Sequence, residues 1–254
     1  MRKAGKWRSY EDLAWTELIL SPPGENEEEV EALCEAMVGK PEPAGPGPRT
    51  LLHLGCGAGV YDRVFKRRFK VTGVDISEGM LKIARRLNKD VRYVRGDMRE
   101  IRLGSAFDAV AIPDSIDYMT TVGDLGKAVE TASIHLKPGG VFLIVAHLRE
   151  QFKENNFVYE GRGRGVCVTV FENNALTGGT GYEATLVYLI RRGKSLEIFS
   201  ERHVLGLFGA TTWDRLLRRK GFSVQRRKGG HGYDRFIARE GEYPQVIFIC
   251  RKTK

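Results

Sequence analysis

The 254-residue sequence has no long apolar run and no segment that resembles a secretory signal. A membrane-spanning helix needs roughly 20 consecutive apolar residues, and no segment approaches that length, so we expect no membrane span. The basic residues 1–8 are not followed by the apolar stretch of a signal peptide, and we expect none. With 42% hydrophobic and 29% charged residues, the chain is expected to be globular rather than disordered.

Cysteines are also few and far apart. No CxxC pair occurs among them, which excludes the usual zinc and redox motifs, and four cysteines in this length do not make a disulfide scaffold. The five histidines have no paired spacing, so we expect no metal site. Reduced thiols and a cytoplasmic location are therefore expected. The cysteines are Cys34, Cys56, Cys167 and Cys250.

The net charge of +9 permits an anionic partner, either a nucleic acid or a phosphorylated small molecule. Basic residues gather in one stretch of the C-terminal part, but the aromatic residues that would stack on bases are sparse there. A solvated surface is the simpler interpretation of this stretch. Its members are Arg215, Arg218, Arg219, Lys220, Arg226, Arg227 and Lys228.

Apolar strands alternate with amphipathic helices from Thr50 onward, after a helix over 25–38 and a proline-rich connector over 40–49. This alternation predicts an α/β fold with a mostly parallel, doubly wound sheet. Ser77 and Asp124 are expected to cap the second and third helices of the series. The predicted strands are 51–54, 70–74, 91–94, 107–112 and 141–146, and the predicted helices are 60–69, 78–87 and 125–136.

The second half departs from this alternation. Three strands without intervening helices, 166–171, 184–190 and 196–200, predict an antiparallel insertion with a hairpin turn at Gly193. A capping box between Thr211 and Asp214 is expected to open a helix that Gly221 closes. Residues 222–224 and 245–250 are expected to form a final antiparallel pair.

A glycine-rich turn, Gly55-Cys56-Gly57-Ala58-Gly59, follows the first predicted strand of the α/β region. A dinucleotide-binding turn would need glycine at the position of Val60, so the spacing does not fit NAD. Asp75 ends the next strand, where a carboxylate can accept hydrogen bonds from both hydroxyls of a ribose. Asp97 and Met98 end the third strand, where they can hold an adenine by its amine and its face.

Together these motifs resemble the class I S-adenosylmethionine-dependent methyltransferases. The resemblance covers about residues 50–146 and rests on Leu51–Gly59, Val74–Ser77 followed by Met80-Leu81, Gly96–Met98, Phe107–Val110 and Leu136–Gly140. It implies a Rossmann-like, seven-stranded doubly wound sheet whose last strand is antiparallel, with an antiparallel β insertion after strand five. The implied cofactor is S-adenosylmethionine, and the residues implied to bind it are Gly55, Cys56, Gly57, Gly59, Asp75, Ile76, Met80, Gly96, Asp97, Met98, Pro113 and Ser115.

One position departs from the family pattern. The family usually carries an acidic residue two positions before the first glycine of the turn, and this chain carries His53. The departure leaves open how the amino group of the cofactor is held.

The insertion and the aromatic N-terminal segment resemble the parts that cover the active site in small-molecule methyltransferases. Four regions are expected: a helical lid with its connector (1–49), a cofactor-binding core (50–150), a substrate-covering insertion (151–210), and the closing helix and β pair of the core (211–254). Tyr10 and Trp15 are expected to lie against the cofactor.

Methyl transfer requires alignment of donor and acceptor, assisted by a base that deprotonates the acceptor. His147, after strand five, is the first candidate for this base, followed by Tyr118 and Asp114 after strand four. Arg149 and His203 are candidates for binding the substrate. His135 is expected to be structural, and His231 is not expected to be catalytic.

The sequence thus predicts an enzyme that transfers a methyl group to an N- or O-nucleophile of a small molecule, which can be anionic. One alternative is an RNA methyltransferase, disfavoured because the Asn/Asp-Pro-Pro-aromatic and Pro-Cys motifs of nucleobase methyltransferases are absent. Another is a catalytically silent family member that serves as a binding or structural subunit. A monomer and a homodimer are both compatible with the sequence.

Overall fold

The computed structural model describes residues 7–22, 24–39, 49–163, 165–230 and 232–253. The first six residues, His231 and all of the predicted connector except Arg49 lie outside them. Within the described ranges, no helix is long and apolar enough to cross a membrane.

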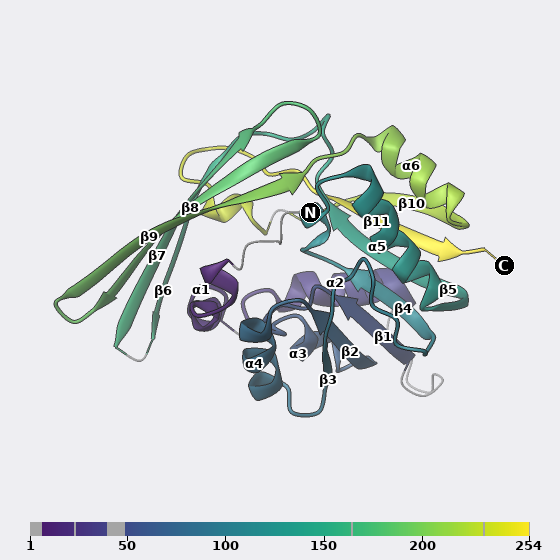
Figure 1. Ribbon diagram of the computed structural model, residues 1–254, viewed down its shortest axis with the longest axis horizontal. Helices are drawn as coiled ribbons and strands as arrows, with labels where there is room; N and C mark the ends of the chain where they lie inside the picture. The colour runs from purple at the N-terminus through teal and green to yellow at the C-terminus, as the bar shows by residue number, and fades with distance from the viewer. Residues whose placement is uncertain (1–6, 23, 40–48, 164, 231, 254) are drawn as a thin grey trace.

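A seven-stranded sheet forms the centre of the molecule, in the order β10-β11-β5-β4-β1-β2-β3 (Figure 1). The pairs β3–β2, β2–β1, β1–β4 and β4–β5 are parallel, and β11 runs antiparallel to both β5 and β10. The predicted Rossmann-like fold with an antiparallel last strand is therefore confirmed. The strands are β1 (Arg49–Leu54), β2 (Phe69–Asp75), β3 (Arg92–Arg95), β4 (Phe107–Ile112), β5 (Leu136–Ala146), β10 (Phe222–Lys228) and β11 (Val246–Lys252).

Helices cover both faces of this sheet, which explains why its central strands are apolar along nearly their whole length. On one face, α5 (Val122–Ile134) and α6 (Ala210–Arg219) bury Leu125, Val129, Trp213 and Leu217 against the strands. On the other face, α2 (Glu27–Val38) and the single turn α3 (Asp62–Phe65) pack on the sheet. The buried side of α2 consists of Val30, Leu33, Cys34 and Met37, which helical spacing places on one face.

The antiparallel insertion is a second sheet of four strands in the order β6-β7-β8-β9, and it projects from the core in Figure 1. Its strands are β6 (Asn156–Gly163), β7 (Val166–Leu176), β8 (Gly181–Arg192) and β9 (Ser195–Gly206). The predicted turn at Gly193 joins the last two, with its φ at 57°. The sequence analysis missed β6, because its two glycines and its charged residues mask the strand pattern.

Two helix starts were predicted incorrectly. Asp124 is not the cap of α5: the Thr121 hydroxyl accepts the Asp124 N–H at 3.0 Å, so the helix begins three residues earlier than expected. Thr211 does not cap α6 either, because Gly209 occupies the N-cap position and the Glu150 carboxylate accepts the Ala210 N–H at 3.1 Å. The Ser77 cap of α4 (Glu78–Leu87) is confirmed by its bond from the Met80 N–H at 3.1 Å.

Element boundaries differ from the prediction in other places too, and two of them change an element's type or extent the most. The helix expected over 60–69 is only the turn α3, because the chain must enter β2 at Phe69. The residues between the predicted helix 125–136 and the predicted strand 141–146 belong to β5, which begins at Leu136 and pairs there with Phe107.

The N-terminal segment, residues 7–22, lies between the two sheets (Figure 1). It comprises η1 (Arg8–Tyr10), η2 (Ala14–Thr16) and α1 (Glu17–Leu20). Two glycines permit its close approach on either side. A Cβ at Gly79 of α4 would collide with the backbone carbonyls of Tyr10 and Glu11, and a Cβ at Gly161 of β6 would overlap the carbonyl of Ile19.

We expect Gly161→Ala to lower the free energy of unfolding by about 1–3 kcal/mol, because the added methyl group must displace the backbone at Ile19. Gly163→Ala is the matched control on the same strand, where the nearest atom to the added Cβ is a side-chain carbon at 3.9 Å. Denaturant melts of both variants test this expectation, and an equal effect of the two substitutions would contradict it.

Candidate active site

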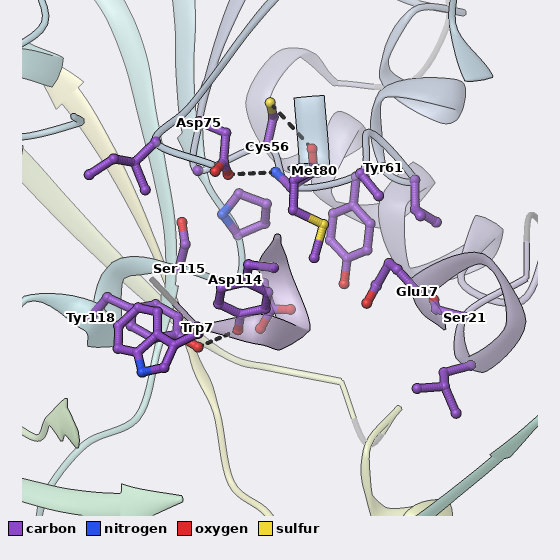
Figure 2. Close-up of a pocket in the computed structure, with 18 of the residues that line it drawn as sticks. Trp7, Glu17, Ser21, Cys56, Tyr61, Asp75, Met80, Asp114, Ser115 and Tyr118 are labelled. Carbon is purple, nitrogen blue, oxygen red and sulfur yellow. Dashed lines mark hydrogen bonds between the residues drawn. The ribbon is translucent and has the colours of Figure 1, made fainter. Parts of the chain in front are cut away.

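A cavity of about 610 Å³ opens at the carboxyl ends of β1, β2 and β4. The core forms one side of it, and the N-terminal segment and the inserted sheet close the others. Figure 2 shows Asp75 and Cys56 at one end of the cavity, Trp7 and Tyr118 at another, and Glu17 and Tyr61 beside a third wall. Asp114 lies among these groups (Figure 2).

The glycine turn after β1 supplies the part of the cavity wall that is mostly backbone. Gly55, Gly57 and Gly59 all have positive φ, at 72°, 52° and 73°. The Gly55 N–H donates to the Val74 carbonyl at 2.7 Å, which ties the turn to the end of β2. Of the turn residues predicted to bind the cofactor, Gly55, Cys56 and Gly57 line the cavity and Gly59 does not. A Cβ at Gly59 would meet Tyr93, so its role is packing beneath the turn.

Asp75 lies at the end of β2 and lines the cavity. One of its carboxylate oxygens accepts the Gly57 N–H at 2.8 Å, and the other accepts the Ser77 N–H at 2.8 Å. Burial raises the pKa of this carboxyl, and the bonds from Ser77 and Gly57 oppose the rise. Each oxygen accepts one bond and keeps acceptor capacity, which is the arrangement that a ribose diol needs.

The next part of the cavity carries the residues predicted for adenine. Ile76 is 53% exposed and lines it, together with Gly96 and Met98. Asp97 also lines it, but two guanidinium nitrogens of Arg99 donate hydrogen bonds to its carboxylate, at 3.0 and 2.5 Å. Burial alone would raise the pKa of Asp97, and the Arg99 contacts outweigh it and leave the pKa lowered. The other residues expected at the cofactor, Met80, Pro113 and Ser115, line the cavity too.

Of the two aromatic residues predicted to cover the cofactor, only Tyr10 lines the cavity. Its hydroxyl bonds to that of Tyr118, and its carbonyl accepts the Ser77 hydroxyl at 2.5 Å. The prediction for Trp15 was wrong: this ring packs on the inserted sheet, 4.9 Å from the Arg192 guanidinium. Trp7, which the sequence analysis did not select, lines the cavity instead.

A smaller chamber of about 180 Å³ adjoins the cavity beneath the inserted sheet. His147 lines it, 6% exposed, with Nδ1 at 2.7 Å from Asp117 and with a buried Nε2 that bonds to none of the described residues. His203 lines it as well, bonded to the Tyr118 hydroxyl at 2.9 Å and to Glu201 at 3.0 Å. The wall shared by both spaces consists of Tyr10, Asp114, Ser115, Tyr118, Tyr159, Leu186 and Tyr233.

Arg149 does not contribute to either space. Its side chain is exposed, and its backbone N–H bonds to the Phe208 carbonyl at 3.2 Å. The prediction that it binds substrate was therefore wrong: Leu148, which follows His147, is still buried, and the chain reaches solvent at Arg149.

Several carboxylates gather around the cavity with raised pKa values. The pKa of Asp114 is raised to about 8, chiefly by desolvation and further by the charges of Glu29, Glu17 and Asp117, while a hydrogen bond from Tyr233 at 3.0 Å opposes the rise. Burial also raises the pKa values of Glu17 and Glu29. The sequence analysis missed both glutamates, because nothing local distinguishes them from solvated helix residues.

No group of three or more histidine, cysteine, aspartate or glutamate side chains could hold a metal ion within the described ranges. The cavity instead offers a glycine-rich backbone turn, a carboxylate with free acceptor capacity and an apolar slot. These features fit the methionine, ribose and adenine parts of S-adenosylmethionine in that order.

Comparison with known proteins agrees with this geometry. A family model described as a methyltransferase domain matches residues 51–140. The chain is 30% identical over 189 residues, covering 73% of its length and 80% of the relative's, to dTDP-3-amino-3,4,6-trideoxy-alpha-D-glucopyranose N,N-dimethyltransferase of Streptomyces venezuelae. It is also 30% identical to dTDP-3-amino-3,6-dideoxy-alpha-D-glucopyranose N,N-dimethyltransferase of Streptomyces fradiae, covering 73% of this chain and 74% of that one.

Solved structures share the fold. DesVI of Streptomyces venezuelae superposes with a TM-score of 0.76 at 24% identity, over 91% of this chain and 93% of DesVI. The amino pentose methyltransferase CalS10 of Micromonospora echinaspora was solved with S-adenosylmethionine bound. It superposes with a TM-score of 0.74 at 24% identity, over 95% of this chain and 96% of CalS10.

Fold and site together define a methyltransferase that uses S-adenosylmethionine as its cofactor. The chain belongs to the class I S-adenosylmethionine-dependent methyltransferases of the small-molecule type, whose acceptors are nitrogen or oxygen nucleophiles. The predicted enzyme class and cofactor are confirmed.

We expect Asp75→Ala to weaken S-adenosylmethionine binding by about 1.5–3 kcal/mol, because a charged acceptor for the ribose hydroxyls is lost. Titration calorimetry measures the change. Asp90→Ala, which removes a carboxylate paired with Lys66 away from the cavity, is the control and should leave the affinity unchanged. Unchanged affinity in Asp75→Ala would exclude the proposed role.

The raised pKa of Asp114 predicts a pH-dependent effect on stability. Between about pH 4 and pH 8 the folded state keeps a proton that the unfolded state releases, so the contribution of this group to stability falls as pH rises through that window. Asp114→Asn removes the free-energy cost of burying an ionisable carboxyl group at this position. It should raise the free energy of unfolding at pH 8 by about 1–3 kcal/mol, less than the full shift implies because the side chain is open to the cavity.

At pH 4 the gain should vanish, because the carboxyl is then protonated in both states. Asp90→Asn is the control of opposite sign, since the hydrogen bond from Lys66 lowers the pKa of Asp90. Melts of both variants at pH 4 and pH 8 make the comparison. A gain in Asp114→Asn of equal size at both pH values would contradict the assignment.

Proposed function

We propose that this enzyme methylates the amino group of a nucleotide-linked amino sugar. The observation that carries the proposal is the set of carboxylates around the cavity: Asp114, Glu17 and Glu29 line it in a chain whose net charge is +9. Carboxylates gathered in a concave site against the sign of the whole protein favour a cationic ligand. An amine acceptor, which arrives as an ammonium ion, is such a ligand.

Asp114 is the proposed general base. The nitrogen lone pair can attack only after the ammonium group has lost a proton, and a base performs best when its pKa lies near the working pH. With a pKa of about 8, the Asp114 carboxylate can take this proton and become a neutral carboxylic acid. Tyr233 donates a hydrogen bond to the carboxylate at 3.0 Å and fixes its orientation.

When bound, S-adenosylmethionine supplies a methyl group on a positively charged sulfur, which needs no further activation. The remaining task of the protein is to align the acceptor and exclude water. The N-terminal segment closes the cavity through the contact between the hydroxyls of Tyr10 and Tyr118. We assign the core to cofactor binding, and the N-terminal segment and inserted sheet to covering the acceptor.

His147, the first candidate for the base from the sequence, is better suited to orienting the acceptor. It lines the chamber and not the larger cavity, and its Nδ1 is engaged by Asp117. Its Nε2 has no hydrogen-bond partner within the described ranges. Together with His203 and the Glu172 carboxyl it gives the chamber polar groups that suit the hydroxyls of a sugar ring. We propose that the sugar ring occupies this chamber.

Arginines at the edge of the cavity suit a nucleotide diphosphate. Arg202 and Arg235 line the cavity, and both are exposed. Each is paired with a glutamate, Arg202 with Glu183 and Arg235 with Glu25, so a diphosphate would replace these partners. An acceptor with a cationic amine at one end and a diphosphate at the other would suit both the carboxylates and the arginines that line the cavity. The relatives named above carry this acceptor type in their names.

The RNA alternative has less support. The basic stretch lies on α6 and β10 and just after them, and none of its residues lines the cavity. Lys220 is paired with Glu130 and Arg226 with Asp214.

The four cysteines are free thiols, two of them with pKa values raised to about 12 by burial, which fits the cytoplasmic location that we propose.

A methylation assay with S-adenosylmethionine and a panel of dTDP-linked amino sugars tests the proposal. We expect the amino sugars to gain one or two methyl groups by mass spectrometry. The control acceptors are the same dTDP-sugars with a hydroxyl in place of the amine, which should stay unmodified. Methylation of the hydroxyl sugars or of bulk RNA, with none on any amine, would refute it.

The pH profile tests the role of Asp114. Because the base must be ionised in the free enzyme, kcat/KM should fall as pH decreases below about 8. Asp114→Asn should lower turnover by about 10²–10⁴-fold and abolish this acidic limb. Asp90→Asn, the control, should retain both the turnover and the acidic limb of the wild-type enzyme. An Asp114→Asn variant with an unchanged limb would assign the base elsewhere.

If His147 orients the acceptor, His147→Ala should raise KM about 10-fold and change turnover little, because the binding lost is shared by ground and transition states. Cofactor affinity should not change. Steady-state kinetics with the acceptor found above separate the two roles. If turnover instead falls by about 10²-fold or more while KM stays the same, His147 is restored as the base.

A further inference from the structure

His53 occupies the position where the family usually has an acidic residue, and the structure shows what surrounds it. It lies on β1, two residues before the glycine turn, and its side chain lines the cavity although it is only 3% exposed. Its ring packs edge-on against Phe65, with centroids 5.4 Å apart. The imidazole is therefore held rigidly at the wall next to Gly55 and Cys56.

A carboxylate lies directly behind this histidine. Asp62, the first residue of α3, is fully buried, and its Oδ1 lies 2.7 Å from His53 Nδ1. Its Oδ2 accepts the Tyr93 hydroxyl at 2.8 Å. Asn88 donates both to that hydroxyl, at 3.0 Å, and to the Gly59 carbonyl, at 2.8 Å. The network thus connects the buried carboxylate to the underside of the glycine turn.

This arrangement fixes the chemistry of the imidazole. An ionised carboxylate only accepts hydrogen bonds, so Nδ1 carries the hydrogen that it donates to Asp62. In a neutral imidazole the other nitrogen, Nε2, is then an acceptor. Among the described residues no hydrogen bond reaches Nε2, and the residue lines the part of the cavity formed by the glycine turn.

We propose that His53 Nε2 accepts a hydrogen bond from the α-ammonium group of the methionine part of S-adenosylmethionine. Asp62 is the positioning residue: it selects the tautomer and supplies the negative charge from behind the ring. The pair thereby replaces the single acidic side chain that the family usually has here. The inference goes beyond the proposed function, because it concerns the cofactor and holds for any acceptor.

Binding measurements without any acceptor test the proposal. S-adenosylhomocysteine contains the amino acid part, whereas 5′-methylthioadenosine contains only the nucleoside and the sulfur. By titration calorimetry, His53→Ala should weaken S-adenosylhomocysteine binding about 10- to 100-fold, as expected for loss of a hydrogen bond to a charged group. Binding of 5′-methylthioadenosine should stay within about 2-fold. The Asp75→Ala variant is the control and should weaken both ligands alike.

Two further variants separate recognition from packing. Asp62→Asn keeps the shape of the buried side chain and should cause a smaller loss that is again confined to S-adenosylhomocysteine. The double variant His53→Asp/Asp62→Asn restores an acid at the family position and should recover the affinity. Equal losses for both ligands in the single variants would show a structural role and overturn the proposal, as would unchanged binding.

Analogues of S-adenosylhomocysteine identify the group that His53 contacts. The wild-type protein should discriminate against the analogue without the α-amino group, and His53→Ala should lose this discrimination. If His53→Ala instead loses discrimination against the analogue without the carboxylate, His53 acts as a donor to the carboxylate, and the proposal is wrong.

Discussion

The site depends on the left-handed glycine turn that follows β1. Its backbone is fixed to β2 by three bonds: Gly55 and Cys56 both donate to the Val74 carbonyl, and Gly57 donates to the Asp75 carboxylate. A side chain at Gly55 would collide with Ser115, which follows β4. The turn thus allows three strand ends to approach one another, and the space left between them is the cofactor end of the cavity.

The end of the cavity that we propose for the acceptor is closed by parts of the chain that are remote in sequence. Glu201 of β9 accepts the backbone N–H groups of Arg8 and Ser9, at 3.0 and 3.3 Å, and its other contact is His203. The same N-terminal segment bonds through Tyr10 to Ser77 of the core. The segment therefore couples the inserted sheet to the cofactor-binding sheet, and anything that displaces it alters both ends of the cavity.

Chemistry and stability oppose each other around Asp114. Desolvation and, to a smaller extent, the neighbouring carboxyl groups disfavour a negative charge on Asp114, and its raised pKa expresses that cost. The same shift brings the group close to the pH at which it can take a proton from an amine. A protein with a large apolar core can tolerate a local penalty of this kind at its working surface.

The sequence by itself determined the features that depend on neighbouring residues. These are the order of strands and helices, the glycine turn, Asp75 at a strand end and the Ser77 cap, because backbone geometry and periodicity act over a few positions. Only the tertiary structure decided which distant side chains meet. It placed Asp62 behind His53 and brought Glu17 and Glu29 close to Asp114. It also left Arg149 exposed to solvent, and Trp7 rather than Trp15 lines the cavity. Such contacts depend on how separate elements pack against one another, and no local pattern in the sequence records that packing.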